Sequence, residues 1–352
     1  MNKINMAVRG KNDEFSFLGD VYLDRKYNLK FDLKNIVFNL ESPISERGVP
    51  AKNKINLKQS KSYLKETFKE FPLAVSLANN HIMDFGDVAF EDTLNFLKKN
   101  NIGYFGAGTR NNNYNNPLVI NTFTGKVAFL GYCCNTTNPS NESNKGYRCA
   151  ELDEQAVLND IHDVKNLCDK IILFLHWGEE EIRYPTPKDM KLAHLFIDNG
   201  TDLVIGHHAH VVQYYEIYKG KYIYYGLGNF IFPNFIVRSY WDSKNRSKTI
   251  KKINNKKNNT GAVVLTDSVI KSTRSFLTIF DKVEVNKSNV SIKNYEFPKV
   301  DINNYESFYY KQKRRKILID KVIRFLLDPR VPTFDGLKEL FNLIFTMSVI
   351  KK

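Results

Sequence analysis

Three histidines lie within four residues, directly after a short apolar segment. Residues 203–205 are Leu-Val-Ile, and after a glycine come His207, His208 and His210. Neutral imidazole is the commonest metal-binding side chain in proteins, and a His-x-His pair just past a strand can bring two rings to one pocket. This segment predicts a metal site, for which other parts of the chain must supply further ligands.

Acidic, amide and imidazole side chains also follow the other short apolar segments. These residues are Asp20, Glu41, Asn80 with His81, and His176. The apolar segments alternate with amphipathic ones, which is typical of an α/β fold. In such folds ligands bind beyond the carboxyl ends of the strands. Because all these side chains follow predicted strands, we expect them to meet at one place.

Hydrophobic periodicity predicts the elements that position these residues. Strands are expected at residues 15–18, 36–40, 73–77, 118–120, 126–132, 171–175, 203–205 and 222–225, and again near 261–265 and 276–280. Helices are expected over residues 60–71, 87–100, 153–168 and 188–199, and again beyond Lys311. Asn229 is expected to end the last core strand.

Asp, Glu, Asn and His together suit a divalent ion such as Mn²⁺, Zn²⁺ or Fe²⁺. The four cysteines have no zinc-ligand spacing, which argues against a structural zinc site; a bridge from Cys133 or Cys134 to Cys149 stays open. A carboxylate shared by two ions and flanked by imidazoles describes a two-metal hydrolase. In that chemistry His81, beside Asn80, would protonate the departing oxygen as a general acid.

Several motifs together resemble the CapA-type capsule and poly-gamma-glutamate biosynthesis proteins, a branch of the calcineurin-like metallophosphoesterases. They are Gly19-Asp20, Asn39-Leu40-Glu41, the segment 76–81 (SLANNH), the segment 175–178 (LHWG), the segment 206–211 (GHHAHV) and the segment 227–230 (LGNF). The resemblance covers about residues 15–232. It implies a four-layer αββα sandwich. We expect this domain to span residues 13–300, and the residues from Lys311 onward indicate a basic helical C-terminal extension over residues 301–352.

The resemblance also implies a role for each matching residue. The metal ligands would be Asp20, Glu41 in the bridging position, Asn80, His176, His208 and His210, and the general acid would be His81. Four further candidates for metal or pocket contacts are His207, Asn79, Glu179 and Asn229. The family motif can be aligned with either His207 or His208 as its first histidine. Asn79 could have a structural role alone, and Glu179 could be solvated or could orient His176.

Two departures from the wider superfamily bear on the number of metal ions. The first motif there is usually Asp-x-His, but Tyr22 stands where that histidine would be. The bridging residue is usually Asp, and here it is Glu41. The cofactor is therefore expected to be one or two divalent ions, with Mn, Zn, Fe and Mg not distinguished, and a one-metal or inactive site stays open.

The net charge of +14 and the isoelectric point near 9.3 favour an acidic partner, namely an anionic polymer or a phosphorylated substrate. A well-solvated basic surface explains the charge equally well, and no nucleic-acid-binding motif accompanies it. The cationic segment 238–259 is expected to be a solvated loop. The basic C-terminal helix suits peripheral contact with an anionic membrane or docking on its own domain.

The predicted function is that of a metal-dependent hydrolase of phosphoester or related linkages in capsule or cell-surface polymer biosynthesis. The alternative is a non-catalytic accessory protein that binds an anionic polymer or a lipid-linked intermediate. The N-terminus lacks the apolar region of a secretory signal, and no stretch is long and apolar enough to span a bilayer. We therefore expect a cytoplasmic protein. The alternative is a cytoplasmic protein that associates with the membrane through its C-terminal helix.

Overall fold

The computed structural model describes residues 5–9, 14–30, 32–52, 54–112, 114–140, 143–233, 235–240, 248–253, 262–266, 277–286, 289–294 and 305–326. The chain divides into two compact units. The first comprises Met1–Pro233 with Asn255–Val300, and the second comprises Asn234–Asn254 with Asp301–Lys352. All the predicted metal-site residues belong to the first unit.

One sheet of the first unit has seven strands. Their order is β1 (Asn5–Arg9), β8 (Leu118–Asn121), β9 (Lys126–Cys133), β11 (Lys170–His176), β12 (Leu203–His207), β14 (Lys221–Tyr224) and β13 (Tyr215–Tyr218). The central strands β9, β11, β12 and β14 run parallel. Parallel strands are covered on both faces, which explains why they are continuous apolar runs in the sequence.

The second sheet has nine strands. Eight of them are ordered β3 (Asn28–Leu29), β20 (Asn289–Asn294), β19 (Leu277–Asn286), β18 (Ala262–Thr266), β2 (Phe15–Val21), β4 (Ile36–Leu40), β5 (Ala74–Ser76) and β6 (Gly103–Phe105), and β15 (Asn229–Ile231) pairs with β2. Strands β2, β4, β5 and β6 are parallel. A two-stranded sheet joins β7 (Ala107–Gly108) to β10 (Arg148–Cys149).

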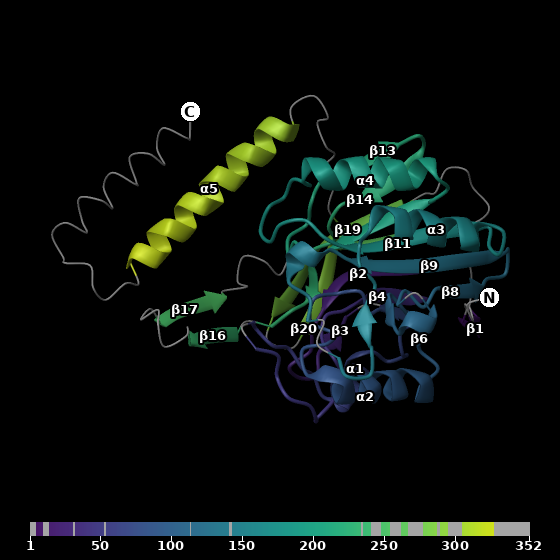
Figure 1. Ribbon diagram of the computed structural model, residues 1–352, viewed down its shortest axis with the longest axis horizontal. Helices are drawn as coiled ribbons and strands as arrows, with labels where there is room; N and C mark the ends of the chain where they lie inside the picture. Colours follow the sequence, from purple (N-terminus) through teal and green to yellow (C-terminus); the bar gives the residue numbers. More distant parts are fainter. Residues whose placement is uncertain are drawn as a thin grey trace. The chain divides into compact units, whose positions relative to one another are not determined.

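Helices cover the outer face of each sheet (Figure 1). Helices α3 (Glu154–Lys165) and α4 (Pro187–Asp198) lie on the seven-stranded sheet, and α1 (Lys61–Thr67) and α2 (Gly86–Lys99) lie on the other. Short 3-10 helices occupy Arg110–Asn112 and Asn135–Thr137. The layers are therefore helix, sheet, sheet and helix, which confirms the predicted αββα sandwich.

Aromatic side chains fill the space between the two sheets. Phe17 of β2 lies 5.9 Å from Phe174 of β11 between ring centroids, and Phe105 of β6 lies 5.2 Å from the same ring. A second core, which includes Phe68 and Phe90, lies between the nine-stranded sheet and helices α1 and α2. Burial of such rings removes a large apolar area from water and fixes the two sheets against each other.

The predicted helices agree with α1 to α4 to within a few residues at most ends. Helix α4 begins at a capping box, in which the Thr186 hydroxyl accepts from the Asp189 amide and the Asp189 carboxylate accepts from the Thr186 amide. Pro187 occupies the first turn, where its missing amide hydrogen costs nothing. All four cysteines lie in the described part of the chain and none forms a disulfide.

The prediction for residues 238–259 is wrong where the structure describes them. Strand β16 (Phe235–Tyr240) pairs antiparallel with β17 (Lys248–Ile253), so these segments form a hairpin instead of a loop. The first strand contains Phe, Ile, Val and Tyr, and the second contains Thr and two Ile between lysines. Such β-branched and aromatic residues favour strands, although the many lysines are typical of a solvated loop. Residues 241–247 and 254–259 lie outside the described part.

The second unit also contains helix α5 (Tyr305–Leu326). Its presence confirms the predicted C-terminal helix over that range, whereas residues 327–352 lie outside the described part of the chain. Among the described helices, none has the length and apolar character needed to cross a membrane.

Candidate metal centre

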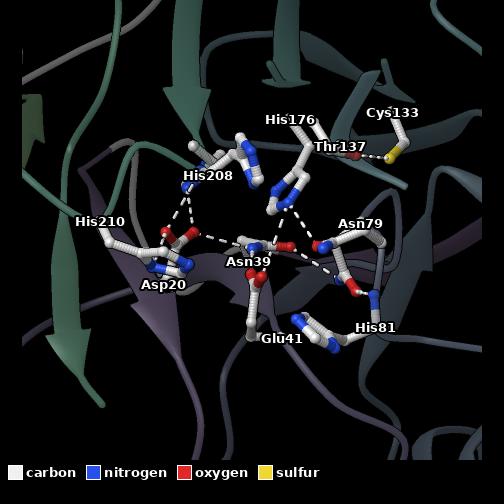
Figure 2. A network of polar contacts seen from close by, with 12 residues as sticks. Asp20, Asn39, Glu41, Asn79, His81, Cys133, Thr137, His176, His208 and His210 are labelled. Carbon is white, nitrogen blue, oxygen red and sulfur yellow. Dashed lines mark hydrogen bonds and ion pairs between the residues drawn. The ribbon is translucent and has the colours of Figure 1, made fainter. Parts of the chain in front are cut away.

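The predicted ligands lie between the two sheets, at the carboxyl ends of their central strands (Figure 2). Asp20 lies near the end of β2 and Glu41 follows β4, both from the nine-stranded sheet. His176 ends β11, and His208 follows β12, both from the seven-stranded sheet. Residues separated by up to 188 positions in sequence are thus brought to one buried place.

Asp20, Glu41 and His176 form one group that could hold a metal ion. Each offers a ligand atom, and the three atoms lie within 4.8 Å of one another. His176 Nε2 lies 3.5 Å from Glu41 Oε1 and 2.9 Å from Asn80 Oδ1. Glu41 Oε1 is fully buried and has no hydrogen-bond partner. A buried carboxylate oxygen left in this way fits a metal ligand, because an unsatisfied buried acceptor is otherwise costly.

Two buried carboxylates lie close together in this group, and their electrostatics favour a cation. Burial raises the pKa of Glu41 well above its ordinary value, and the nearby charge of Asp20 raises it further. Burial also acts to raise the pKa of Asp20, but contacts from His207 and His210 outweigh it and hold that pKa well below its ordinary value. A divalent ion between the two carboxylates would offset their repulsion.

Hydrogen bonds hold the Asp20 carboxylate in place. Asn39 Nδ2 donates to Oδ1 at 2.8 Å, and the same amide contacts Glu41 Oε2. The His208 amide donates to Oδ2 at 3.3 Å, and His207 Nδ1 lies 3.1 Å from Oδ1. Asn39 therefore bridges the two carboxylates and fixes the spacing between them.

A second group comprises Glu180, His208 and His210, whose ligand atoms also lie within 4.8 Å of one another. Burial lowers the pKa of His208 to about 4, so its ring is neutral, the form that binds metals. Burial lowers the pKa of His210 too, but its contact with Asp20 outweighs this and raises the pKa to about 10. Positive charge is therefore favoured at His210, where a metal ion would compete with the proton.

The loop that carries these histidines has an uncommon backbone. His208 has φ +86° and His210 has φ +54°, values that side chains other than glycine rarely adopt. Gly206 precedes them because a Cβ at this position would lie 1.8 Å from the Tyr225 carbonyl oxygen. Trp177 packs at the same place, buried, with Nε1 donating to that oxygen at 2.9 Å.

His81 directly follows Asn80, whose Oδ1 lies 2.9 Å from His176 Nε2. Two charged residues hold its ring. Its Nδ1 lies 2.6 Å from Asp84 Oδ2, and Lys54 Nζ lies 2.6 Å from Asp84 Oδ1. Lys54 also donates to the Asn80 carbonyl. Burial lowers the pKa of His81, while Asp84 acts to raise it. Asp84 therefore orients the ring and stabilises its protonated form.

The four further candidates lie in different surroundings. Asn79 donates to Asn39 Oδ1 and to the Leu40 carbonyl, and it accepts from the His81 amide, so it holds the turn together. Asn229 Oδ1 lies 2.8 Å from His210 Nδ1. His207, whose ring stacks on Phe174 at 5.3 Å, belongs to neither metal-binding group. Glu179 belongs to neither group either.

Asn229 occupies a different element from the one expected. It begins β15, which pairs with β2 so that Asn229 lies opposite Asp20, and it does not end the strand at residues 221–224. The chain leaves the seven-stranded sheet after β14 and adds a strand to the other sheet. Local sequence pattern does not reveal such a change of sheet.

Four residues of the centre escaped the sequence analysis: Asn39, Lys54, Asp84 and Glu180. Two had a usable signal. Asn39 lies two residues before Glu41, and strand alternation places such residues on one face; Asp84 follows His81 by three residues in a turn. Glu180 is one of three consecutive glutamates, a pattern that predicts only a solvent-exposed segment. Nothing in the local sequence distinguishes Lys54 from the other lysines.

A four-layer sandwich whose strand ends carry clustered carboxylate and imidazole side chains defines a metallophosphoesterase-type protein. A family model described as bacterial capsule synthesis protein PGA_cap matches residues 16–234, and the chain belongs to this family. The capsule biosynthesis protein CapA of Bacillus anthracis is 32% identical over 162 residues, which cover 45% of this chain and 39% of that protein. The PGA biosynthesis protein CapA of Bacillus subtilis is 29% identical over 239 residues, which cover 65% and 59%. The matches thus span less than two thirds of these relatives.

Solved structures similar to this chain include a phosphatase of Mycoplasma pneumoniae, with a TM-score of 0.43 and 14% identity, covering 85% of this chain and 99% of that one. Another is the NAD nucleotidase of Haemophilus influenzae, with a TM-score of 0.40 and 11% identity, covering 86% and 60%. Both scores lie below 0.5. The fold assignment therefore depends on the layers described above and on the family match.

Proposed function

We propose that this chain is a metal-dependent hydrolase that cleaves a phosphoester or a related linkage during biosynthesis of capsule or another cell-surface polymer. The observation that supports it most is the His81–Asp84 pair, which directly follows Asn80, a contact of His176 in one of the two groups of metal-binding side chains. The place in polymer biosynthesis is supported by the family match and by the names of the two CapA relatives.

In this proposal Asp20, Glu41, Asn80, His176, His208 and His210 hold one or two divalent ions, with Mn, Zn, Fe and Mg all compatible with these ligands. Bound ions would supply the positive charge that polarises the scissile linkage and offsets negative charge as it develops. Asn39 keeps the two carboxylates apart at a fixed spacing. The substrate is a phosphorylated or otherwise anionic polymer or its precursor.

His81 is the proposed general acid. Its Nδ1 faces Asp84, so in the protonated ring Nε2 carries the proton that passes to the departing oxygen. Asp84 stabilises that protonated ring, and Lys54 fixes the Asp84 carboxylate. General acid catalysis of this kind contributes about 10²- to 10⁴-fold to a rate.

The test uses the full chain, stripped of metal and then reconstituted, with para-nitrophenyl phosphate as the generic substrate. Turnover should depend on added metal. The variant His81→Ala should lose about 10²-fold or more in kcat while elemental analysis shows unchanged metal content. Unchanged turnover in this variant contradicts the acid role, and no metal-dependent turnover by the wild type on aryl phosphates or phosphodiesters contradicts phosphoester hydrolysis.

A second candidate function is a non-catalytic accessory role in binding an anionic polymer or a lipid-linked intermediate. The observation that favours it is the net charge of +14. Binding to poly-glutamate that weakens with salt, and that survives both removal of metal and replacement of Glu41, supports this role. Binding that disappears together with the metal favours the hydrolase instead.

A further inference from the structure

Glu180 lies in the loop that follows β11, four residues after His176. Strands β11 and β12 are parallel neighbours, with His176 paired in register to His207. The residues that follow the two strands therefore emerge side by side at the same edge of the sheet. Glu180 is thus placed by the fold next to the loop that carries His208 and His210.

A backbone hydrogen bond fixes the two loops to each other at this point. The Glu181 amide donates to the Ala209 carbonyl at 2.8 Å. Glu181 directly follows Glu180, and Ala209 lies between His208 and His210. This main-chain hydrogen bond holds the backbone of Glu180 close to the backbone of His208 and His210. The proximity of the three potential ligands therefore does not depend on side-chain conformation alone.

The three side chains are close enough to share an ion. One ligand atom from each of Glu180, His208 and His210 lies within 4.8 Å of the others. Two donors bound to one ion at about 2.1 Å are separated by about 3 to 4 Å. Small rotations of the side chains would therefore complete the coordination, without movement of the backbone.

A second, independent observation concerns His208. This residue is only 6% exposed, and its Nδ1 is buried without a hydrogen-bond partner. A buried polar atom left without a partner is costly and needs an explanation in a folded chain. A bound cation at Nδ1 supplies one.

This group shares no residue with the group formed by Asp20, Glu41 and His176. The two groups touch where His210 Nδ1 lies 3.4 Å from Asp20 Oδ2. Tyr22, two residues after Asp20, carries a phenol in place of an imidazole, and its ring packs against Phe232 with centroids 5.5 Å apart.

We infer that Glu180 is the carboxylate ligand of a second divalent ion, held with His208 and His210 next to the ion of Asp20, Glu41 and His176. The inference rests on the metal-dependent function proposed above and specifies how a second ion is bound in this chain. Its test measures metal binding and does not require turnover.

The experiment titrates the metal-free full chain with Mn²⁺ and with Co²⁺, using calorimetry and elemental analysis for stoichiometry and visible absorption for Co²⁺ coordination. The wild type should bind two ions. Glu180→Gln should bind one ion with unchanged affinity and the other at least 10-fold more weakly, with part of the Co²⁺ absorption lost. Glu180→Asp, which keeps a carboxylate, should retain both ions at reduced affinity for one.

Glu181→Gln is the matched control, because it makes the same chemical change at the adjacent, exposed position; it should bind two ions as the wild type does. Circular dichroism and thermal unfolding establish that each variant is folded. Two ions bound by Glu180→Gln with wild-type affinities overturn the inference. So does a wild type that binds a single ion whose affinity Glu180→Gln leaves unchanged, or a folded Glu180→Gln that binds none. A wild type that binds two ions but hydrolyses no substrate contradicts only the proposed function.

Discussion

The individual residues of the centre are arranged to bind a cation. The same arrangement makes the folded chain less stable when no cation is bound. Asp20 and Glu41 are both fully buried and share the Asn39 amide. Burying two carboxylates together is unfavourable unless positive charge accompanies them. Here imidazoles supply part of that charge, and a metal ion would supply the rest.

This arrangement predicts the effect of Glu41→Gln. In metal-free protein the substitution removes one of two neighbouring acidic groups while keeping a similar shape, so the free energy of unfolding should rise by about 1 kcal/mol or more. Added Mn²⁺ should raise the melting temperature of the variant by less than that of the wild type, because binding to the folded state stabilises it and the variant lacks one ligand of the first ion. Differential scanning calorimetry at several Mn²⁺ concentrations measures both effects. Equal metal-induced shifts in the two proteins would exclude Glu41 as a ligand.

Asp84, which contacts His81, forms an ion pair with Lys54, and the two side chains are 0% and 7% exposed. Lys54→Met leaves the Asp84 carboxylate buried without its cation and should cost about 3 kcal/mol. The double variant with Asp84→Asn should recover most of that stability but not the turnover, because the asparagine no longer favours the protonated His81 ring. Urea unfolding and the pH profile of kcat separate the two effects. Full recovery of kcat in the double variant would mean that the pair is structural alone.

At the scale of elements, the centre depends on loops that join strand ends to helices, and one contact of Asp92 ties such a loop to helix α2. Asp92 of α2 accepts from Arg47 and from Ser45 Oγ, both at 2.6 Å. The contact with Arg47, helped by Ser45, lowers the pKa of Asp92 to about 2. The segment after Glu41 is thereby fixed against the helix that follows His81.

The contact between Asp92 and Arg47 makes the stability of the folded chain depend on pH. Because the pKa of Asp92 is lower in the folded chain than in the unfolded one, its stabilising contribution is present above about pH 4 and is lost as the pH falls toward 2. Arg47 is 65% exposed in its side chain, so solvent screening limits the loss to about 1 kcal/mol. Urea unfolding from pH 5 to 2 should show a smaller decline for Asp92→Asn than for the wild type. Asp32→Asn, which alters an exposed pair with Lys69, should decline as the wild type does.

For the whole molecule, the positive charge is the property to test. We propose that the net charge of +14 draws the chain to anionic surfaces or polymers, with the basic residues of α5 taking part. Vesicles containing an anionic lipid should retain the protein at low salt and release it near 0.5 M salt. The reason is that the screening length is about 10 Å at 0.1 M and falls toward about 3 Å at 1 M, which weakens the attraction between the charges. Replacement of Lys311, Arg314 and Arg315 by glutamine should weaken retention several-fold in a sedimentation assay. Equal retention on neutral vesicles would contradict the proposal.

The sequence by itself determined the α/β class, most of the helices and strands of the first unit, and the motifs from which the αββα sandwich was predicted. These features depend on local periodicity and on motifs of adjacent residues. It also pointed to Asp20, Glu41, His176, His208 and His210, because each is a ligand-type residue next to a predicted strand end.

Only the tertiary structure decided which ligand stands next to which. It separated the histidines, leaving His207 on Asp20 and Phe174 while His208 and His210 join Glu180. It also placed Asn229 on the other sheet and brought Lys54 against Asp84. These relations follow from the packing of two sheets face to face, which makes residues distant in the chain neighbours. Periodicity along the chain carries no information about that packing.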